Sequence, residues 1–423
     1  MKICVIGAGY VGLTCVACLA EIGHQIVCIE KDEKKLNNLK KGIVSIFEPN
    51  MEELILKNKS KITFSSEIKD GLIDSNICYI AVGTPTLENG EVDTNAIFEV
   101  ANEIAKNIKN YTIIINKSTV PIGFNKKITN FMKERTKTPF DIVSNPEFLR
   151  QGSAINDFLN PERLIIGTSS KKALEEVLKL YKPLNLNDNQ ILTMDENSAE
   201  MVKYAANSFL ALKISYINEI AKLCEKTGAN IEHIKLGLSK DSRIGEKFLN
   251  AGIGFGGSCF PKDTKAIVNI AKEKGIELET IKSAIEINEN QIEYFFQKIM
   301  RFYKNNIKNK TFAILGLAFK PNTNDLREAP SLKLIKKLES NGAKIKAYDP
   351  KAKIENHQVE SVKEAINEAN ALVITTEWQE FKELPLETLL KLKDKAIFDG
   401  RNIFINKNLN EYGLQYFCIG KNE

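Results

Sequence analysis

The 423-residue sequence predicts an α/β protein with two doubly wound domains joined by a long central helix. Three observations support this fold class. Short apolar runs alternate with helical stretches before residue 195, and a helical run without Pro or Gly occupies Glu196–Thr227. The alternation of strands and helices then returns after Lys310. Because neighbouring parallel strands need a crossover helix, such alternation is typical of doubly wound sheets.

The N-terminal domain is predicted to span residues 1–195. It opens as a βαβ unit, with strand Lys2–Ile6, turn Gly7–Gly12, helix Leu13–Ile22 and strand Gln25–Ile29. Further elements are expected at Ile77–Val82, Thr112–Asn116, Ile142–Ser144 and Leu164–Gly167 (strands) and at Thr94–Lys109 (helix).

Residues 196–300 are predicted to form a central helical domain for dimerisation that also carries a catalytic loop. Apolar residues cover more than one stripe of the helix at Glu196–Thr227, so it must be buried on several sides, between domains or against a second subunit. These residues are Val202, Ala205, Ala206, Phe209, Leu210, Leu212, Ile214, Ile217, Ile220, Ala221 and Cys224.

A second Rossmann-like domain is predicted at residues 301–423, because the opening pattern returns there in weaker form. Its expected elements are strands at Thr311–Gly316, Lys344–Tyr348, Leu372–Thr376 and Ala396–Phe398, and a helix at Ser331–Ser340.

Composition narrows the class of protein. The 59 Lys and Arg against 54 Asp and Glu leave a net charge of +5, too weak an excess to indicate nucleic-acid binding. The 43% hydrophobic content provides a sizeable core and excludes wholesale disorder. No apolar run approaches the ~18 residues needed to cross a bilayer, and Ile3–Ile6 runs into a glycine loop rather than forming a signal peptide. We therefore expect a soluble cytoplasmic protein with neither a membrane nor a nucleic-acid partner.

The eight cysteines lack the spacing of a disulfide scaffold. Cys15 and Cys18 have C-x-x-C spacing, but no second pair or His completes a zinc shell, so buried packing is favoured and no metal site is predicted. Most of the others are expected in the core, and Cys259 is the exception.

The glycines Gly7, Gly9 and Gly12 follow a strand and open a helix, and Glu30 ends the next strand. This context is typical of a dinucleotide-binding turn rather than a purely structural one. Glu30 would accept hydrogen bonds from ribose hydroxyls and repel a 2′-phosphate, which favours NAD over NADP, although Lys35 and its neighbouring lysines reduce that selectivity.

Two more segments follow predicted strands, Gly83–Thr86 and Lys117–Pro121. Ligands bind at the carboxyl ends of such strands, so Thr119 could touch the cofactor or substrate; a turn or cap role is equally compatible.

Cys259 follows a loop in which four glycines fall within six residues, and Lys262 and Asp263 come shortly after it. The glycines would let the backbone approach a ligand closely. In so polar and glycine-rich a setting a nucleophilic cysteine is favoured over a packing one, provided that a cation or helix terminus stabilises its thiolate.

Lys203 and Asn207 lie four residues apart, hence on one face of the central helix. Glu147 directly follows a predicted strand and is a candidate acid/base. In isolation, each of these residues would be interpreted as a surface residue.

Taken with Phe47-Glu-Pro49, Asn145–Arg150 and Asp399-Gly-Arg401, these motifs resemble the UDP-glucose/GDP-mannose dehydrogenase family over nearly the whole chain. The segment Gly254–Asp263 is highly specific to it. The Asn-Ala-Gly-Ile lead into this segment is more similar to the UDP-glucose branch than to the GDP-mannose or N-acetylmannosamine branches.

The resemblance implies an NAD-dependent, four-electron oxidation of UDP-glucose to UDP-glucuronate with two NADH per turnover. The implied catalytic residues are the nucleophile Cys259, the groups Lys203, Asn207 and Asp263 around the reacting carbon, the acid/base Glu147, and the water-positioning Thr119. It also implies a homodimer through the central helix, with Arg243 reaching the neighbouring subunit's site.

Contacts to both ligands follow from the same resemblance. The implied cofactor contacts are Gly7, Gly9, Tyr10, Val11, Gly12, Glu30, Lys35, Gly83, Thr84, Thr86, Thr119, Gln151 and Arg327. The implied substrate contacts are Glu147, Phe148, Leu149, Arg150, Gln151, Lys203, Asn207, Arg243, Asn250, Gly252, Gly254, Phe255, Gly256, Phe319, Lys320 and Arg401. One departure is Gln151, where many members have a second Glu, so a second carboxylate base is missing at that position.

Three alternatives stay open on the sequence. The first is a GDP-mannose or other nucleotide-sugar 6-dehydrogenase of the same mechanism. The others are a single-step NAD dehydrogenase without covalent catalysis and a non-catalytic NAD-binding regulator. The three classes of mechanism would yield two, one or no NADH per nucleotide sugar.

Overall fold

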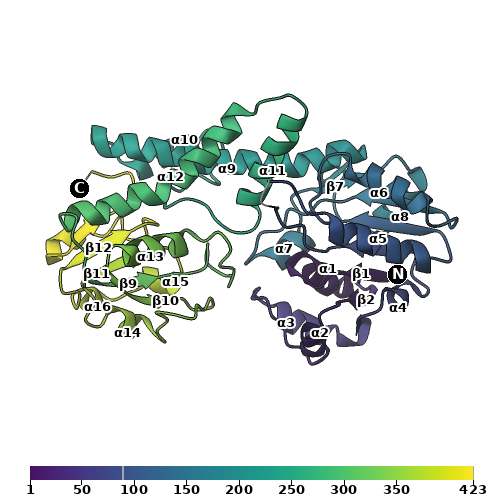
Figure 1. Cartoon of the computed structure of the whole chain (residues 1–423), viewed down its shortest axis with the longest axis horizontal. Helices are drawn as coiled ribbons and strands as arrows, with labels where there is room; N and C mark the ends of the chain where they lie inside the picture. The colour runs from purple at the N-terminus through teal and green to yellow at the C-terminus, as the bar shows by residue number, and fades with distance from the viewer. Residues whose placement is uncertain (88–89, 423) are drawn as a thin grey trace. The chain divides into compact units, whose positions relative to one another are not determined.

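The computed structural model describes residues 1–87 and 90–422. The chain forms two compact units, Met1–Ala206 and Asn207–Glu423, each built on one sheet with helices on both faces. The long helix α9 (Glu196–Thr227) has the predicted bounds and runs from one unit into the next (Figure 1). The predicted fold class is confirmed.

The first unit holds an eight-stranded sheet of order β3-β2-β1-β4-β5-β6-β7-β8. Its strands are β1 (Lys2–Ile6), β2 (Gln25–Ile29), β3 (Ile62–Ser65), β4 (Ile77–Ile80), β5 (Thr112–Asn116), β6 (Phe140–Ser144), β7 (Leu164–Gly167) and β8 (Ile191–Met194). All neighbours are parallel except β6 and β7, which are antiparallel at Ser144 and Gly167. This departs from the fully parallel sheet predicted; the connecting chain contains only the six-residue helix α7 (Ala154–Leu159).

Helices cover both faces of this sheet. They are α1 (Tyr10–Glu21), α2 (Glu33–Lys40), α3 (Met51–Lys57), α4 (Ile68–Leu72), α5 (Asn95–Asn107), α6 (Phe124–Lys133) and α8 (Lys171–Tyr181). Successive strand side chains point to opposite faces, so Ile3 and Val5 pack in the cluster that includes α1, whereas Cys4 and Ile6 pack in the one that includes α5. Burial on both faces is why these strands read as continuous apolar runs.

The second unit holds a parallel five-stranded sheet of order β10-β9-β11-β12-β13. Its strands are β9 (Thr311–Leu315), β10 (Lys344–Tyr348), β11 (Ala371–Ile374), β12 (Ala396–Asp399) and β13 (Gln415–Phe417). Residues from the C-terminal part of α9, from α12 (Glu279–Phe302) and from α13 (Pro330–Ser340) pack on one face. The other face is covered by α14 (Val362–Ile366), α15 (Gln379–Lys382) and α16 (Leu386–Leu389). The remaining helices are α10 (Ile231–Ser239) and α11 (Phe260–Glu273).

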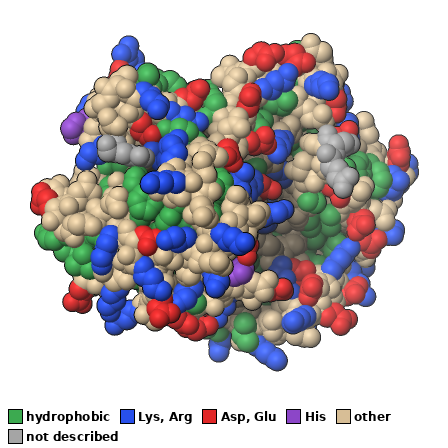
Figure 2. All heavy atoms as spheres, turned by 60° about the vertical axis from the view of Figure 1, so that its left-hand side comes forward, with side chains coloured by type: hydrophobic (Ala, Val, Ile, Leu, Met, Phe, Trp, Pro, Cys, Tyr) green, Lys and Arg blue, Asp and Glu red, His purple; other side chains and the backbone are tan. Residues whose placement is uncertain are grey.

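Two surface properties bear on the predicted partners. Within residues 1–87 and 90–422, none of the helices combines the length and apolarity that a membrane crossing requires. Basic and acidic side chains are interspersed on the face shown in Figure 2, which fits the small net charge of +5.

The start of α9 is tied to α6 by a buried carboxylate. Glu200 is 3% exposed and accepts hydrogen bonds from the backbone N–H groups of Gly123 and Asn125, at the first turn of α6. Burial raises the pKa of Glu200 to about 7, although these N–H groups favour the ionised form. Since residues 117–123 lead into this turn, Glu200 anchors the C-terminal end of the segment that carries Thr119.

This carboxylate predicts a pH-dependent stability. An unfolded Glu has a pKa of ~4.3, so between that value and about 7 the folded chain binds the Glu200 proton more tightly than the unfolded chain. Raising the pH through this window should therefore lower the stability of the native protein relative to Glu200→Gln, with no further change above pH ~8. Calorimetric melting of both proteins at four pH values from 5 to 8 checks this; a constant difference in Tm would contradict it.

Candidate active site

The predicted dinucleotide turn lies between β1 and α1. A Cβ at Gly12 would lie 1.8 Å from the carbonyl oxygen of Gly7, so only glycine fits. A Cβ at Gly9 would meet nothing within 4 Å, and this N-cap residue has no side chain to cap the first turn of α1. This open helix N-terminus suits the pyrophosphate of a dinucleotide.

Glu30 directly follows β2, with its side chain 13% exposed. Its carboxylate accepts hydrogen bonds from the N–H of Asp32 (3.1 Å) and the Nζ of Lys35 (2.6 Å). The predicted cofactor residue Lys35 is thus paired with Glu30, which keeps a carboxylate where the ribose hydroxyls of NAD are expected.

The other predicted cofactor residues of this unit follow further strands. Gly83–Thr86 follows β4, Thr119 follows β5, and Glu147–Gln151 follows β6. Because β1, β2, β4, β5 and β6 are parallel, these segments lie at one edge of the sheet. Thr84 is buried, and Thr119 is partly exposed.

A buried ion pair fixes Glu147. The Nζ of Lys203 lies 2.9 Å from Oε1 of Glu147 and 2.7 Å from its carbonyl oxygen, and the two side chains are 5% and 7% exposed. Burial opposes ionisation, but the Lys203 ammonium and the N–H of Leu149 hold the pKa of the Glu147 carboxyl below its usual range. The carboxylate form is therefore favoured, which suits a proton acceptor.

Lys117 is a residue that sequence reasoning passed over in favour of Thr119. It is 6% exposed, and burial lowers its pKa while the charge of Glu147 acts in the opposite direction. Glu147 therefore has two buried amines near it. The available signal was a lysine placed directly after the wholly buried strand β5.

In the second unit, Cys259 occupies the N-cap position of α11 and is partly exposed, whereas the other seven cysteines are buried. Arg327 pairs with Asp325 at 2.6 Å, and that aspartate, followed by a smaller effect of Cys259, raises the pKa of Arg327. The carbonyl of Arg327 also accepts the N–H of Gly257 at 2.9 Å. A helix N-terminus and a guanidinium are the features that favour a thiolate.

Asp263 lies one turn into α11 and is fully buried. Its two carboxylate oxygens accept hydrogen bonds from Nδ2 of Asn207 and from Nζ of Lys262, each at 2.6 Å. Predicted catalytic residues thus meet within each unit, Glu147 with Lys203 in the first and Asp263 with Asn207 in the second.

Amide side chains hold the glycine loop in place. Gly252 donates to Oδ1 of Asn218 (2.9 Å), and its carbonyl accepts from Nε2 of Gln291 (2.8 Å). Asn288 accepts from the N–H of Phe255 (2.7 Å) and donates to its carbonyl (3.1 Å). These three amides were not predicted, because nothing in the sequence around them points to a distant loop.

The glycine at position 256 has a packing role in the chain itself. A Cβ there would lie 2.3 Å from the carbonyl oxygen of Glu328, so the loop can lie against residues 328–330 only without a side chain. The sequence predicted that these glycines let the backbone of the loop approach a ligand closely. The structure shows that Gly256 also lets the loop approach the backbone of residues 328–330.

Of the remaining predicted substrate residues of the second unit, Arg401 is held by backbone carbonyls, whereas Arg243 and Asn250 are exposed. Arg401 donates from Nε to the carbonyl of Thr375 (2.9 Å) and from a terminal nitrogen to that of Phe319 (3.2 Å). It also lies beside Gly252, where a Cβ would be 3.2 Å from its guanidinium. Arg243, by contrast, is 87% exposed and pairs with Asp241 at 2.6 Å, and Asn250 is exposed.

Comparison with known proteins agrees with this geometry. Family models match residues 1–185 as an NAD-binding domain, 197–290 as a central domain and 313–406 as a UDP-binding domain. With the open turn at Gly7–Gly12, the first match defines an NAD-dependent oxidoreductase. All three models are those of one family, and the chain belongs to it: the UDP-glucose/GDP-mannose dehydrogenase family.

Relatives resemble the chain over its whole length. It is 45% identical to a UDP-glucose 6-dehydrogenase, TuaD, of Bacillus subtilis (strain 168), covering 99% of this chain and 93% of that protein. It is 40% identical to a UDP-glucose 6-dehydrogenase of Rhizobium meliloti (strain 1021), covering 100% of both. The solved structure of a UDP-glucose dehydrogenase from Pyrobaculum islandicum superposes with a TM-score of 0.92 at 30% identity, over 99% of this chain and 97% of that one.

The amide contacts predict a specific effect on the glycine loop. Gln291→Met keeps the side-chain volume but leaves the buried carbonyl of Gly252 without its donor, which should cost ~1–3 kcal/mol. The Tm should fall by several degrees, and hydrogen exchange across residues 250–257 should accelerate. Gln297→Met is the matched control, because Gln297 lies on the same helix but is exposed and donates to the neighbouring Glu293 rather than to the loop. Equal effects of the two substitutions would contradict a role in holding the loop.

Proposed function

We propose that the protein oxidises UDP-glucose to UDP-glucuronate, using two NAD per turnover and a covalent intermediate on Cys259. The observation that carries the proposal is the position of Cys259, partly exposed at the N-terminus of α11 and beside Arg327. The names of the relatives in Bacillus subtilis and Rhizobium meliloti support UDP-glucose as the substrate.

The proposal divides the chain by role. Residues 1–195 would bind NAD, residues 196–300 would supply the dimer interface and the catalytic loop, and residues 301–423 would bind the UDP-sugar. The family matches at 1–185, 197–290 and 313–406 support this division.

The overall reaction balances as RCH₂OH + H₂O + 2 NAD⁺ → RCOO⁻ + 2 NADH + 3 H⁺. Bound NAD supplies the hydride acceptor in each of the two oxidations. After the first, the Cys259 sulfur adds to the aldehyde carbon to give a thiohemiacetal; loss of hydride from that carbon then gives a thioester. Water cleaves the C–S bond and returns the thiol. Because Cys259 must remain a thiol between turnovers, we place the protein in the reducing cytoplasm.

The polar groups of the site would stabilise the negative charge that develops in these steps and would accept the protons that they release. Lys203 and the Asn207 amide would stabilise negative charge on the substrate oxygen, and Asp263 would orient Asn207 through their 2.6 Å hydrogen bond. Glu147, which its lysine neighbours keep ionised, would take the proton of the attacking water, with Thr119 helping to position that water. One carboxylate, that of Glu147, suffices to accept this proton, so the presence of Gln151 in place of a second Glu would not prevent the hydrolysis.

Substrate recognition would use backbone and side-chain groups from several segments. The proposed contacts are Phe148–Gln151, the loop residues Asn250, Gly252, Gly254, Phe255 and Gly256, and Phe319, Lys320 and Arg401. Arg401 is held by the carbonyls of Thr375 and Phe319 beside Gly252, which supports a shared role for these residues in binding UDP.

The decisive experiment counts NADH per nucleotide sugar. UDP-glucose should yield two NADH and UDP-glucuronate, and GDP-mannose or UDP-N-acetylmannosamine should react far more slowly. Cys259→Ala should abolish acid formation without changing NAD affinity, because the dinucleotide turn is at Gly7–Gly12. Cys259→Ser should accumulate an oxygen ester that hydrolyses slowly, visible as added mass on the intact protein.

Cys224→Ala is the control, since Cys224 is buried in the core of the second unit. Preference for another nucleotide sugar would overturn the substrate assignment. One NADH per sugar, or two NADH at a near-native rate from Cys259→Ala, would overturn covalent catalysis. No NADH with any of the three sugars would leave a non-catalytic NAD-binding protein.

We also propose a homodimer formed through α9. Phe209, Tyr216 and Leu223 recur every seven residues on this helix and are 62%, 48% and 59% exposed in the single chain. This spacing places them on one face, whereas Ile217 and Ala221 on another face pack in the core. Large exposed apolar side chains in a row are typical of a protein interface. The exposure of Arg243 supports the role in a neighbouring subunit that the family resemblance implies for it.

If α9 forms the dimer interface, substitutions on its exposed apolar face should halve the molecular mass of the protein in solution. Phe209→Ser combined with Leu223→Ser should convert the dimer into a monomer, because both changes remove apolar area from the shared face. Light scattering after gel filtration measures the mass directly. Ile73→Ser changes another exposed apolar residue, 57% exposed in the first unit, and should leave the dimer intact. A native protein that is monomeric at micromolar concentration would refute the proposal.

A further inference from the structure

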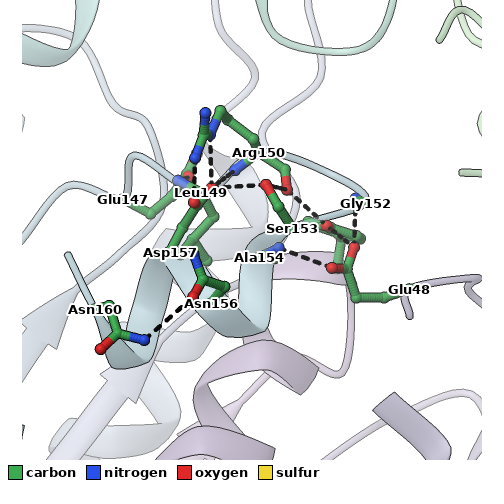
Figure 3. Close-up of polar contacts among 11 residues, drawn as sticks. Glu48, Glu147, Leu149, Arg150, Gly152, Ser153, Ala154, Asn156, Asp157 and Asn160 are labelled. Carbon is green, nitrogen blue, oxygen red and sulfur yellow. Dashed lines mark hydrogen bonds and ion pairs between the residues drawn. The ribbon is translucent and has the colours of Figure 1, made fainter. Parts of the chain in front are cut away.

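The motif Phe47-Glu-Pro49 carried part of the family resemblance but received no role. Its glutamate, Glu48, lies just before α3 and is 5% exposed. Its Oε1 accepts the N–H of Ala154 at 2.7 Å, and its Oε2 accepts the N–H of Gly152 at 2.6 Å (Figure 3). Oε2 also accepts the hydroxyl of Tyr10. One carboxylate therefore has three donors from two distant parts of the chain.

The two ends of this contact belong to different ligand-binding segments. Tyr10 is the first residue of α1 and part of the turn Gly7–Gly12. Gly152 lies in the irregular segment that follows β6 and contains Glu147, and Ala154 is the first residue of α7. Glu48 thus joins the proposed cofactor turn to the segment proposed to carry the base and to contact the sugar.

Only a glutamate completes this set of contacts. The two backbone N–H groups bond different oxygens, so a Gln would turn its NH₂ group toward one of the donors. Burial, followed by the Glu48 carboxylate, raises the pKa of Tyr10, so its hydroxyl remains protonated and donates at any working pH. The Tyr10 oxygen is also 3.3 Å from the carbonyl oxygen of Arg150, within the same segment.

Other contacts hold the rest of the segment independently of the cofactor turn. Arg150 forms a two-point ion pair with Asp157, at 2.6 and 3.0 Å (Figure 3). Lys203 holds Glu147. The part between these anchors and α7 is held by Glu48, together with Ser153, which donates to the Arg150 carbonyl and to Asp157. Tyr10 therefore connects the cofactor turn to this part of the segment through Glu48.

We propose that Glu48 is a positioning residue and that the Tyr10–Glu48 contact makes the binding of NAD and of the nucleotide sugar mutually favourable. This inference rests on the proposed function. A dinucleotide on the turn fixes Tyr10, Tyr10 fixes Glu48, and Glu48 orders residues 151–154, so the second ligand meets a segment that is already ordered. By linkage, each ligand strengthens the other by the same factor.

The test uses NADH and UDP-glucose, which cannot react with each other. Calorimetry gives the Kd of UDP-glucose with and without saturating NADH. The native protein should bind UDP-glucose at least fivefold more tightly with NADH present, and the ratio should fall below twofold in Tyr10→Phe and in Glu48→Gln. Tyr10→Phe keeps the ring, so it preserves packing if Glu48→Gln folds poorly. A native ratio below twofold, or an unchanged ratio in Tyr10→Phe, would overturn the coupling.

A second measurement is independent of the sugar. NADH alone should slow hydrogen exchange of residues 151–154 in the native protein but not in Tyr10→Phe. Tyr111→Phe is the matched control, because it removes a 2.6 Å tyrosine–carboxylate bond to Asp141 in the same unit; it should retain both the coupling and the protection. If UDP-glucose fails to bind while NADH still protects the segment, the substrate assignment is wrong and the positioning role stands. If NADH binds without protecting the segment, the positioning role is wrong.

Discussion

Backbone N–H and C=O groups of buried, irregular segments must find hydrogen-bond partners, and several site segments of this protein are irregular, including residues 147–153 and the loop at residues 252–257. In the first unit the groups to be satisfied are N–H donors, at Gly152 and Ala154 and at the start of α6, and the partners are the carboxylates of Glu48 and Glu200. In the second unit, Gly252 and Phe255 each need a donor and an acceptor, and side-chain amides supply both. The type of side chain follows from the type of backbone group, since carboxylates only accept whereas amides also donate.

The sequence predicts most of what depends on local pattern. Central strands and α9 follow from apolar runs and helical content, and the dinucleotide turn follows from glycine spacing between a strand and a helix. The edge strands β3, β8 and β13 were missed because they are short and partly polar. Contacts that fix the site are less visible: Glu48 is 104 residues from Gly152, and no periodicity relates positions so far apart. The family resemblance drew attention to the Phe47-Glu-Pro49 motif, but the role proposed for Glu48 comes from its contacts.

The two sheets also show how one fold gives one dinucleotide site rather than two. Their first turns share a backbone contact: the N–H of Gly7 bonds the carbonyl of Ile29 at 2.9 Å, and the N–H of Gly316 bonds that of Tyr348 at 2.8 Å. In each case an acidic residue comes next, directly after the second strand of the βαβ unit. The two turns therefore share this backbone contact, and the side chain of the acidic residue that follows differs between the units.

Glu30 and Asp349 differ in what they bond. Glu30 interacts with residues that follow it, Asp32 and Lys35, so the N–H groups at the start of α1 remain available to a phosphate. Asp349 instead accepts the N–H groups of Leu317 and Ala318 at 2.7 and 3.0 Å, within the turn itself. A pyrophosphate at that turn would have to displace a buried carboxylate and would meet its negative charge. The carboxylate of Asp349 thus occupies the backbone N–H groups of the second turn. The second unit would therefore bind its nucleotide through other groups, and those proposed are Arg401 and the loop at Gly252.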